Sequence, residues 1–251
     1  MWSRKKLKQN AKDIMNNNYF NMLGVSVIAT LLNGSLIFSI NEYFNQLGKM
    51  INVQSDPFME ISANENPQAF FVILISLLIG SFFIIVFRLL FNLFIANPIT
   101  VGHSKYYIKN RKNQGNFKDL FYAFRHNYIN IVIVMLLMYI KIFLWTLLLI
   151  IPGIIKSYEY SMIPYILSER PDISYKEAFE LSKQLTEDQK INLFNLDLSF
   201  IGWDLLGMLV CGFGIIFVYP YYYATHVEAY EKLKEIKQIE ISPKIPPIPT
   251  L

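Results

Sequence analysis

The sequence predicts an all-α fold, a polytopic transmembrane bundle of about six membrane helices (range four to six) with short amphipathic surface helices. Three observations predict this class. Hydrophobic residues make up 53% of the 251 residues and charged residues only 17%, below the roughly 25% that is usual in soluble domains. Several apolar stretches approach the roughly 20 residues that a helix needs to cross a hydrocarbon core. Charged residues gather in the segments between these stretches.

The first predicted element is an amphipathic helix over residues 1–16. Leu7, Ala11, Ile14 and Met15 recur at helical spacing, so they share one face, and most of the lysines lie elsewhere around the helix. Such a segment either lies on the membrane surface or is a basic flank that orients the next helix. Both interpretations stay open.

Three apolar stretches follow, each long enough to span a membrane. They cover residues 19–40, 70–96 and 128–151. We expect Asn97-Pro98 to close the second of them, because proline disfavours continuation of a helix.

The segments between these spans predict an orientation. Residues 41–69 carry four acidic residues and a single lysine, whereas residues 99–127 are strongly basic. Basic loops remain on the cytoplasmic side. The sequence therefore predicts a multi-pass protein of the cell membrane with a cytoplasmic amino terminus.

The chain beyond the third span has two possible courses. Pro152 and Gly153 break the helix, and a semi-apolar stretch continues to Leu167. This stretch is either a fourth, short span that returns to the cytoplasm or a kinked continuation of the third. A surface helix over residues 174–185 comes next, because Ser174 with a glutamate three residues later forms a capping box.

The last part of the chain predicts two more spans and a tail. The spans cover residues 191–211 and 215–230. Gly212 and Gly214 lie between them, in a tight turn or a hinge. Residues 1–233 then form a single integral membrane domain, and residues 234–251 form a polar, proline-rich tail.

Several motifs in the second half of the chain occur together. Between Ser157 and Leu233 the chain carries SYEYSMIPYIL, EAFELSKQL, LSFIGWDLL, GFG and PYY in this order. The pattern resembles a family of uncharacterised bacterial integral membrane proteins known as domain of unknown function 975, and the amino-terminal RKKLKQNAK is similar to that family's start. The resemblance implies no activity, cofactor or catalytic residue.

Four ionisable residues fall inside the predicted spans: Arg88, Lys141, Asp197 and Asp204. Each costs about 2.5–3.5 kcal/mol on insertion scales. The two aspartates project from nearly the same side of one helix, about 10 Å apart along its axis, which is too far to share a proton. They pair with Arg88 or Lys141 across helices, or the four residues line a solute path, or the two long cations extend to the interface.

Signatures of enzymes and of metal or cofactor sites are absent from the sequence. There is no Gly-x-Ser-x-Gly, His-Glu-x-x-His or phosphate-binding glycine-rich loop. His103, His126 and His226 lie in three separate elements, which is not the pattern of a zinc site. Orientation and anionic lipid account for the basic loop better than nucleic acid does.

These observations favour a non-enzymatic accessory or binding component of the bacterial cell membrane. Its expected partners are the lipid bilayer and another membrane protein or a second copy of the chain. The alternative is a small transporter or permease subunit in which the four intramembrane charges line the path. An intramembrane enzyme is the third hypothesis.

Overall fold

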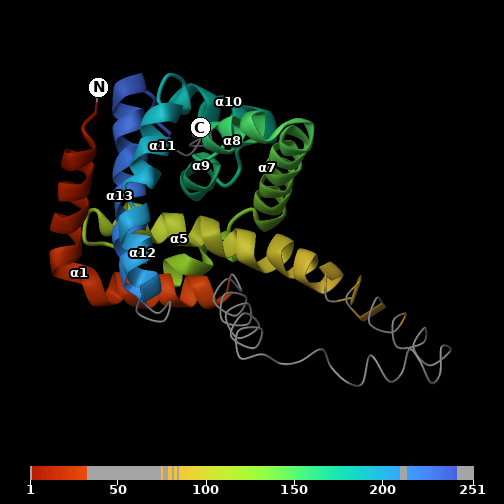
Figure 1. Cartoon of the computed structure of the whole chain (residues 1–251), viewed down its shortest axis with the longest axis horizontal. Coiled ribbons are helices and arrows are strands. Elements are labelled where there is room, and N and C mark those ends of the chain that lie inside the picture. Colours follow the sequence, from red (N-terminus) through yellow and green to blue (C-terminus); the bar gives the residue numbers. More distant parts are fainter. Residues whose placement is uncertain are drawn as a thin grey trace, which may run out of the picture. The chain divides into compact units, whose positions relative to one another are not determined.

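The computed structural model describes residues 2–32, 75, 79–80, 82–83, 85–209 and 214–241. Every element in these ranges is helical (Figure 1), which confirms the predicted all-α class there. The chain forms two compact units, one of Met1–Ala29 with Asn97–Leu251 and one of Thr30–Ala96. The predicted acidic loop, Gly212 and the last ten residues lie outside the described residues.

Helix α1, Arg4–Leu32, contains both the predicted amphipathic segment and the start of the first predicted span. It bends at Asn18, whose backbone is not helical (φ −136°, ψ 18°). Leu7 and Ala11, from the predicted apolar face, are buried in the protein. The first half of α1 lies antiparallel beside α13 (Gly214–Lys237), since Asn10 contacts Glu228 and Tyr19 donates to the Phe217 carbonyl (Figure 1).

The predicted end of the second span at Asn97-Pro98 is wrong. Helical residues run from Ile85 to Asn110, through the π-helix η1 (Asn92–Ala96) and then α5 (Asn97–Asn110). Pro98 is tolerated because it occupies the first turn of α5, where its missing N–H is not needed. A π turn directly before it changes the local winding of the helix.

The predicted basic loop over residues 99–127 is also wrong, because most of it is helical and its first helix is largely buried. Helix α5 contributes fully buried side chains to the core, among them Val101, Tyr106 and Tyr107. Helices η2 (Phe117–Phe121) and α6 (Tyr122–Arg125) follow. Gly102 lets η2 approach α5 closely, since a Cβ there would lie 1.9 Å from the Leu120 carbonyl oxygen.

Helices α7 (Tyr128–Leu148) and α8 (Ile150–Glu159) form a hairpin. The chain reverses at Leu149, which is extended (φ −158°, ψ 143°), three residues before the predicted break. Pro152 lies in the first turn of α8, where proline is tolerated. A Cβ at Gly153 would lie 2.2 Å from Thr146 Oγ1, so this glycine permits close packing of the two helices.

Three shorter helices build the region after the hairpin: α9 (Ile163–Glu169), α10 (Tyr175–Thr186) and α11 (Lys190–Leu198). At the start of α10, Ser174 accepts the Glu177 amide as the sequence predicts. The Glu177 carboxylate does not complete the predicted box, because it pairs with Arg170 at 2.8 Å.

The predicted span over residues 191–211 is not one helix. It is divided at Ser199-Phe200 into α11 and α12 (Ile201–Leu209), each of nine residues. Gly214 then begins α13 against Gly207, where a Cβ would lie 2.7 Å from the Gly207 Cα. The close glycine contact joins α12 and α13 into a second hairpin.

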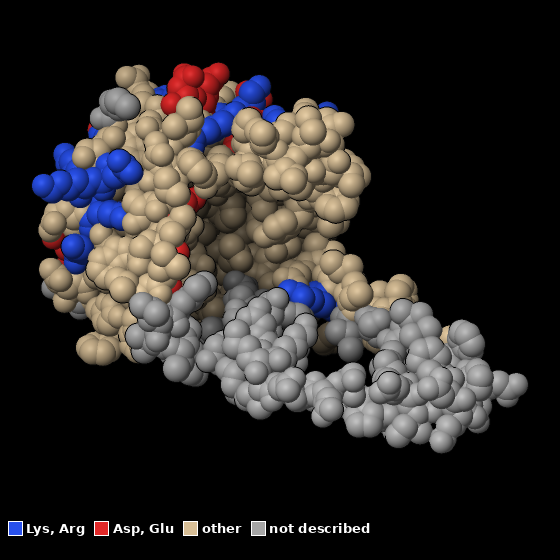
Figure 2. Space-filling view, viewed as in Figure 1, with Lys and Arg blue, Asp and Glu red and all other residues tan. Residues whose placement is uncertain are grey.

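The predicted bundle of about six membrane helices is not confirmed. Among the described residues, two helices are long and apolar enough to cross a membrane, Ile85–Asn110 and Tyr128–Leu148, and Asn18–Leu32 is a shorter apolar helix. Figure 2 shows that charged side chains gather over the first half of α1 and around α10 and α11, whereas the visible surface of α7 is almost uncharged.

Candidate functional site

The structure brings two of the four predicted site residues to one pocket. Asp197 on α11 and Asp204 on α12 both line it. Lys141 on α7 does not, because its ammonium lies 3.8 Å from the centre of the Phe179 ring. Arg88 belongs to the other compact unit, residues 30–96.

The pocket that the two aspartates line has a volume of about 450 Å³ and is built by α8, α11, α12 and α13. We name it the aromatic pocket, because most of its wall is rings. They are Tyr158, Phe194, Tyr219, Tyr222 and Tyr223.

Asp197 is held by side chains from two other helices. Tyr158 on α8 donates its hydroxyl to Oδ2 (2.8 Å), and Tyr222 on α13 donates to Oδ1 (3.2 Å). His226 Nε2 lies 2.8 Å from Oδ1. Tyr222 and His226 are four residues apart, so they share a face of α13. Asp197 therefore ties three helices together and fixes two of the pocket's rings.

Asp204 differs from Asp197 in its surroundings. It is half-buried and lines the same pocket. Within the part of the chain that the structure describes, its carboxylate has no hydrogen bond or ion pair. The pocket thus contains one aspartate that is already satisfied and one that is available.

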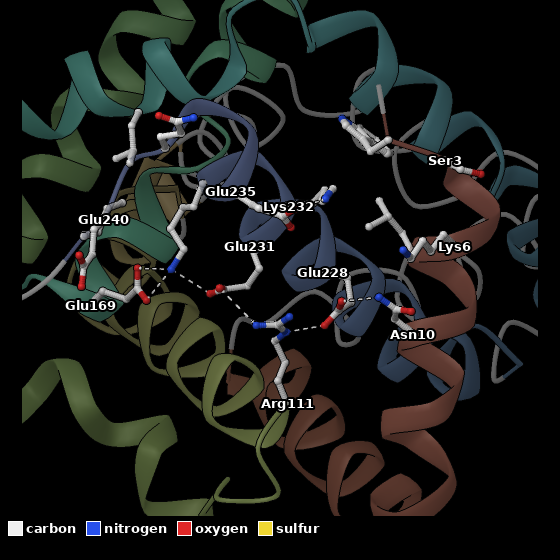
Figure 3. A pocket seen from close by; sticks show the side chains of 16 residues that line it. Ser3, Lys6, Asn10, Arg111, Glu169, Glu228, Glu231, Lys232, Glu235 and Glu240 are labelled. Atoms are coloured by element: carbon white, nitrogen blue, oxygen red, sulfur yellow. Dashed lines mark hydrogen bonds and ion pairs between the residues drawn. The ribbon is translucent and has the colours of Figure 1, made fainter.

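A second hollow, the charged cleft, lies between the first turns of α1 and the last turns of α13 (Figure 3). Its volume is about 850 Å³. Arg111 pairs with Glu228 and, at 3.2 Å, with Glu231. Lys234 pairs with Glu231 and Glu169, each at 2.9 Å. These acidic and basic groups neutralise one another. Their ion pairs hold α9 and α13 together and connect α13 to Arg111, the residue that follows α5.

Another buried acid, Glu159 at the end of α8, joins neighbouring helices in the same way. Its carboxylate pairs with Lys156 at 2.6 Å and with Lys190 at 2.7 Å. Burial raises the pKa of Glu159, but the hydrogen bonds and charges of the two lysines outweigh burial, and the net pKa is lowered. Glu159 is therefore ionised at neutral pH and links α8 to α11.

Each of the three histidines lies against an aromatic ring. His103 is buried between the rings of Tyr107 and Tyr223, and His126 stacks on Tyr122 with ring centres 4.2 Å apart. Across the described ranges, no group of three or more histidine, cysteine or acidic side chains could hold a metal ion.

Sequence reasoning identified both aspartates but not the groups around Asp197. Tyr158 and His226 lie 39 and 29 residues from it along the chain. The available signal was the four-residue spacing of Tyr222 and His226, which predicts that they share one helix face but does not identify the residue that they contact.

The model of a family described as "Protein of unknown function (DUF975)" matches residues 146–237. This match confirms the resemblance seen in the sequence for that part of the chain. The matched residues include every residue that lines the aromatic pocket. No curated protein and no solved structure matches the chain.

Proposed function

We propose that the protein is a multi-pass integral membrane protein that acts as a non-enzymatic binding component of the cell membrane. The observation that carries this proposal is the exposure of α7. Of its most apolar 18 residues, only 28% are buried inside the protein. The core helix of a soluble protein would be mostly buried, so lipid is the medium that suits this surface.

The tip of the α7–α8 hairpin is an exposed apolar segment. Leu147, Leu148, Leu149, Ile150 and Ile151 are consecutive, and each is 64–73% exposed. Exposing such side chains to water costs about 25 cal/mol per Å² of apolar surface. Lys156 lies 5.4 Å from the centre of the Trp145 ring behind this tip, an arrangement suited to a membrane interface, where both side chains are favoured. We therefore place the hairpin tip in lipid.

The arrangement of basic residues supports a cytoplasmic amino terminus. The two basic segments of the sequence meet in one unit, since Glu228 contacts both Asn10 of α1 and Arg111 after α5. Asn18 also donates to Asn113, at 2.8 Å. A single side of the membrane accommodates both segments, as the positive-inside rule requires.

A binding component suits the side-chain geometry better than the transporter alternative does. A solute path needs Arg88, Lys141, Asp197 and Asp204 to face a common route. The Lys141 ammonium instead lies over an aromatic ring and outside the aromatic pocket. Asp197 is engaged by three neighbours, which suits a positioning role.

Fluorescence quenching in vesicles tests the proposal. The chain has three tryptophans, so a Trp2→Phe, Trp203→Phe variant leaves Trp145 next to the hairpin tip. The matched control is Trp145→Phe, Trp203→Phe, which leaves Trp2. That residue is 8% exposed and donates to Gln189.

In vesicles of lipids brominated on the acyl chains, we expect strong quenching of Trp145 and little quenching of Trp2. Aqueous iodide should quench Trp145 weakly. Strong quenching of Trp145 by iodide together with none by brominated lipid would place the hairpin in water and overturn the proposal.

A further inference from the structure

We infer that the aromatic pocket binds an ammonium group carried on an apolar body, with Asp204 as its counter-ion. This inference rests on the proposed function, because it names the ligand of the proposed binding component. The pocket's volume, about 450 Å³, lies within the range of roughly 300–1,000 Å³ that ligand sites have.

The wall chemistry selects a cation. Aromatic faces carry negative potential and attract ammonium groups, and quaternary ammonium ligands are held in such cages. Five rings line the pocket together with two carboxylates, and among the residues that the structure describes no lysine or arginine lines it. An anion would face this surface without a counter-charge.

The two aspartates have separate tasks. Asp197 accepts from Tyr158 and Tyr222 and contacts His226, so it is a positioning residue that holds two rings in place. Asp204 has no such partner among the described residues and lines the same pocket. It is therefore the group that pairs with the ligand's charge.

The surface beside the pocket predicts the rest of the ligand. Leu198 and Ile201 line the pocket and are themselves exposed. Leu205 is four residues after Ile201, so it shares the same face of α12, and it is exposed as well. An alkyl chain attached to the ammonium group would lie on these side chains. The chemistry is shared by the amine headgroup of a membrane lipid and by a free long-chain amine.

The charged cleft does not offer such a site. In the charged cleft, Glu228 and Glu231 already pair with Arg111, and Glu169 pairs with Lys234. At these three carboxylates a ligand cation would have to displace a charge of the protein itself.

Calorimetric titration of the purified full chain in maltoside micelles tests the inference. The probes are heptyltrimethylammonium, tetramethylammonium, which has no apolar body, and heptyl sulfate, which has the opposite charge. We expect heptyltrimethylammonium to bind most tightly. Because each variant is titrated in the same micelle, differences between proteins report the pocket and not partition into detergent.

Two variants should weaken binding. Asp204→Asn should reduce affinity about tenfold or more, the effect of losing a charge-assisted contact. Tyr219→Leu should reduce it about threefold by removing one ring. The matched control, Glu180→Gln on the exposed face of α10, should bind as the unaltered protein does. Helical content by circular dichroism verifies that each variant folds.

Either of two results would overturn the inference. In the first, heptyl sulfate binds as tightly as heptyltrimethylammonium. In the second, Asp204→Asn and Tyr219→Leu both bind heptyltrimethylammonium as tightly as the unaltered protein does. If Trp145 is quenched by brominated lipid while no probe binds, the ligand assignment fails and the membrane placement remains. Absence of that quenching removes the proposed function itself.

Nanodiscs distinguish the two sources of the ammonium group. If a lipid headgroup is the ligand, phosphatidylethanolamine nanodiscs should compete with heptyltrimethylammonium, whereas phosphatidylglycerol nanodiscs should not. Equal probe affinity in both nanodiscs would assign the pocket to a free amine. Either result supports an ammonium site, and loss of all probe binding in both would contradict it.

Discussion

Replacing Gly102 with alanine tests whether α5 is the buried centre of its unit. A Cβ at this position would lie 1.9 Å from the Leu120 carbonyl oxygen and 2.9 Å from that of Asp119. Both atoms are backbone, so no side chain can rotate away. Even the tightest contact that real Cβ atoms tolerate, 3.0 Å, requires η2 to retreat from α5 by about 1 Å.

The expected cost follows from two opposing effects. Overpacking of this kind costs about 1–3 kcal/mol or more, and two backbone contacts place Gly102→Ala at the upper end. Alanine gains up to about 1 kcal/mol over glycine in a helix interior. The net expectation is a loss of about 2 kcal/mol, which lowers the thermal midpoint by about 4–8 °C for a chain of this length.

The matched control is Gly24→Ala, another helix-interior glycine. Its Cβ would lie 3.6 Å from the Phe117 ring, an ordinary contact. Only the helix-propensity gain remains, so the midpoint should rise by a few degrees, about 1–4 °C. Circular dichroism melts of both variants in the same detergent at one scan rate provide the comparison. Equal midpoints for Gly102→Ala and the unaltered protein would refute the close packing of α5 and η2.

Two further predictions concern buried acids. Asp197→Asn should lower the free energy of unfolding by about 1–3 kcal/mol, because two tyrosine hydroxyls and a histidine lose a charged acceptor. Asp204→Asn should leave the thermal midpoint unchanged. Equal effects of the two substitutions would refute the separate roles of the two aspartates. Stability should also fall as the pH decreases below about 4.5, where unfolded glutamates protonate. Because the pKa of Glu159 is lowered in the folded protein, its ion pairs stabilise the fold above this pH, and that stabilisation is lost as the pH falls further. Glu159→Gln should therefore make the thermal midpoint depend less on pH in this range. An unchanged dependence of the midpoint on pH would contradict the prediction.

The helical class and several local signals could be predicted from the sequence. Composition and apolar spacing predict helices, and Ser174 begins α10 as its capping signal indicates. These signals are local, since they depend on residues within one or two turns of each other.

The buried α5 could not be predicted, because the partners of its cations are distant in the chain. Lys105 donates to the Ser168 carbonyl at 2.7 Å, and Arg111 pairs with Glu228. A rule that counts basic residues in a loop cannot detect such partners. Of the basic residues that indicated a loop, Lys105, Lys109 and Arg111 instead connect α5 and its end to neighbouring elements.

The division of the span over residues 191–211 has a similar cause. The Ser199 carbonyl accepts from Lys8 of α1 at 3.2 Å, and the Lys8 ammonium lies 4.1 Å from the centre of the Phe200 ring. The amino-terminal helix therefore stabilises the irregular backbone between α11 and α12. A periodic apolar pattern does not contain this information, because the contact joins residues 191 positions apart.

Helix α8 connects the membrane placement with the proposed ligand. Its first residues, Ile150 and Ile151, belong to the exposed hairpin tip. Two turns later, Tyr158 forms part of the aromatic pocket and donates to Asp197, and Glu159 joins the helix to Lys190 on α11. Ten residues of helix span only about 15 Å, so in the proposed placement the lipid around the tip lies within one lipid length of the pocket. A ligand with an apolar body would then reach Asp204 from the membrane side without first entering water.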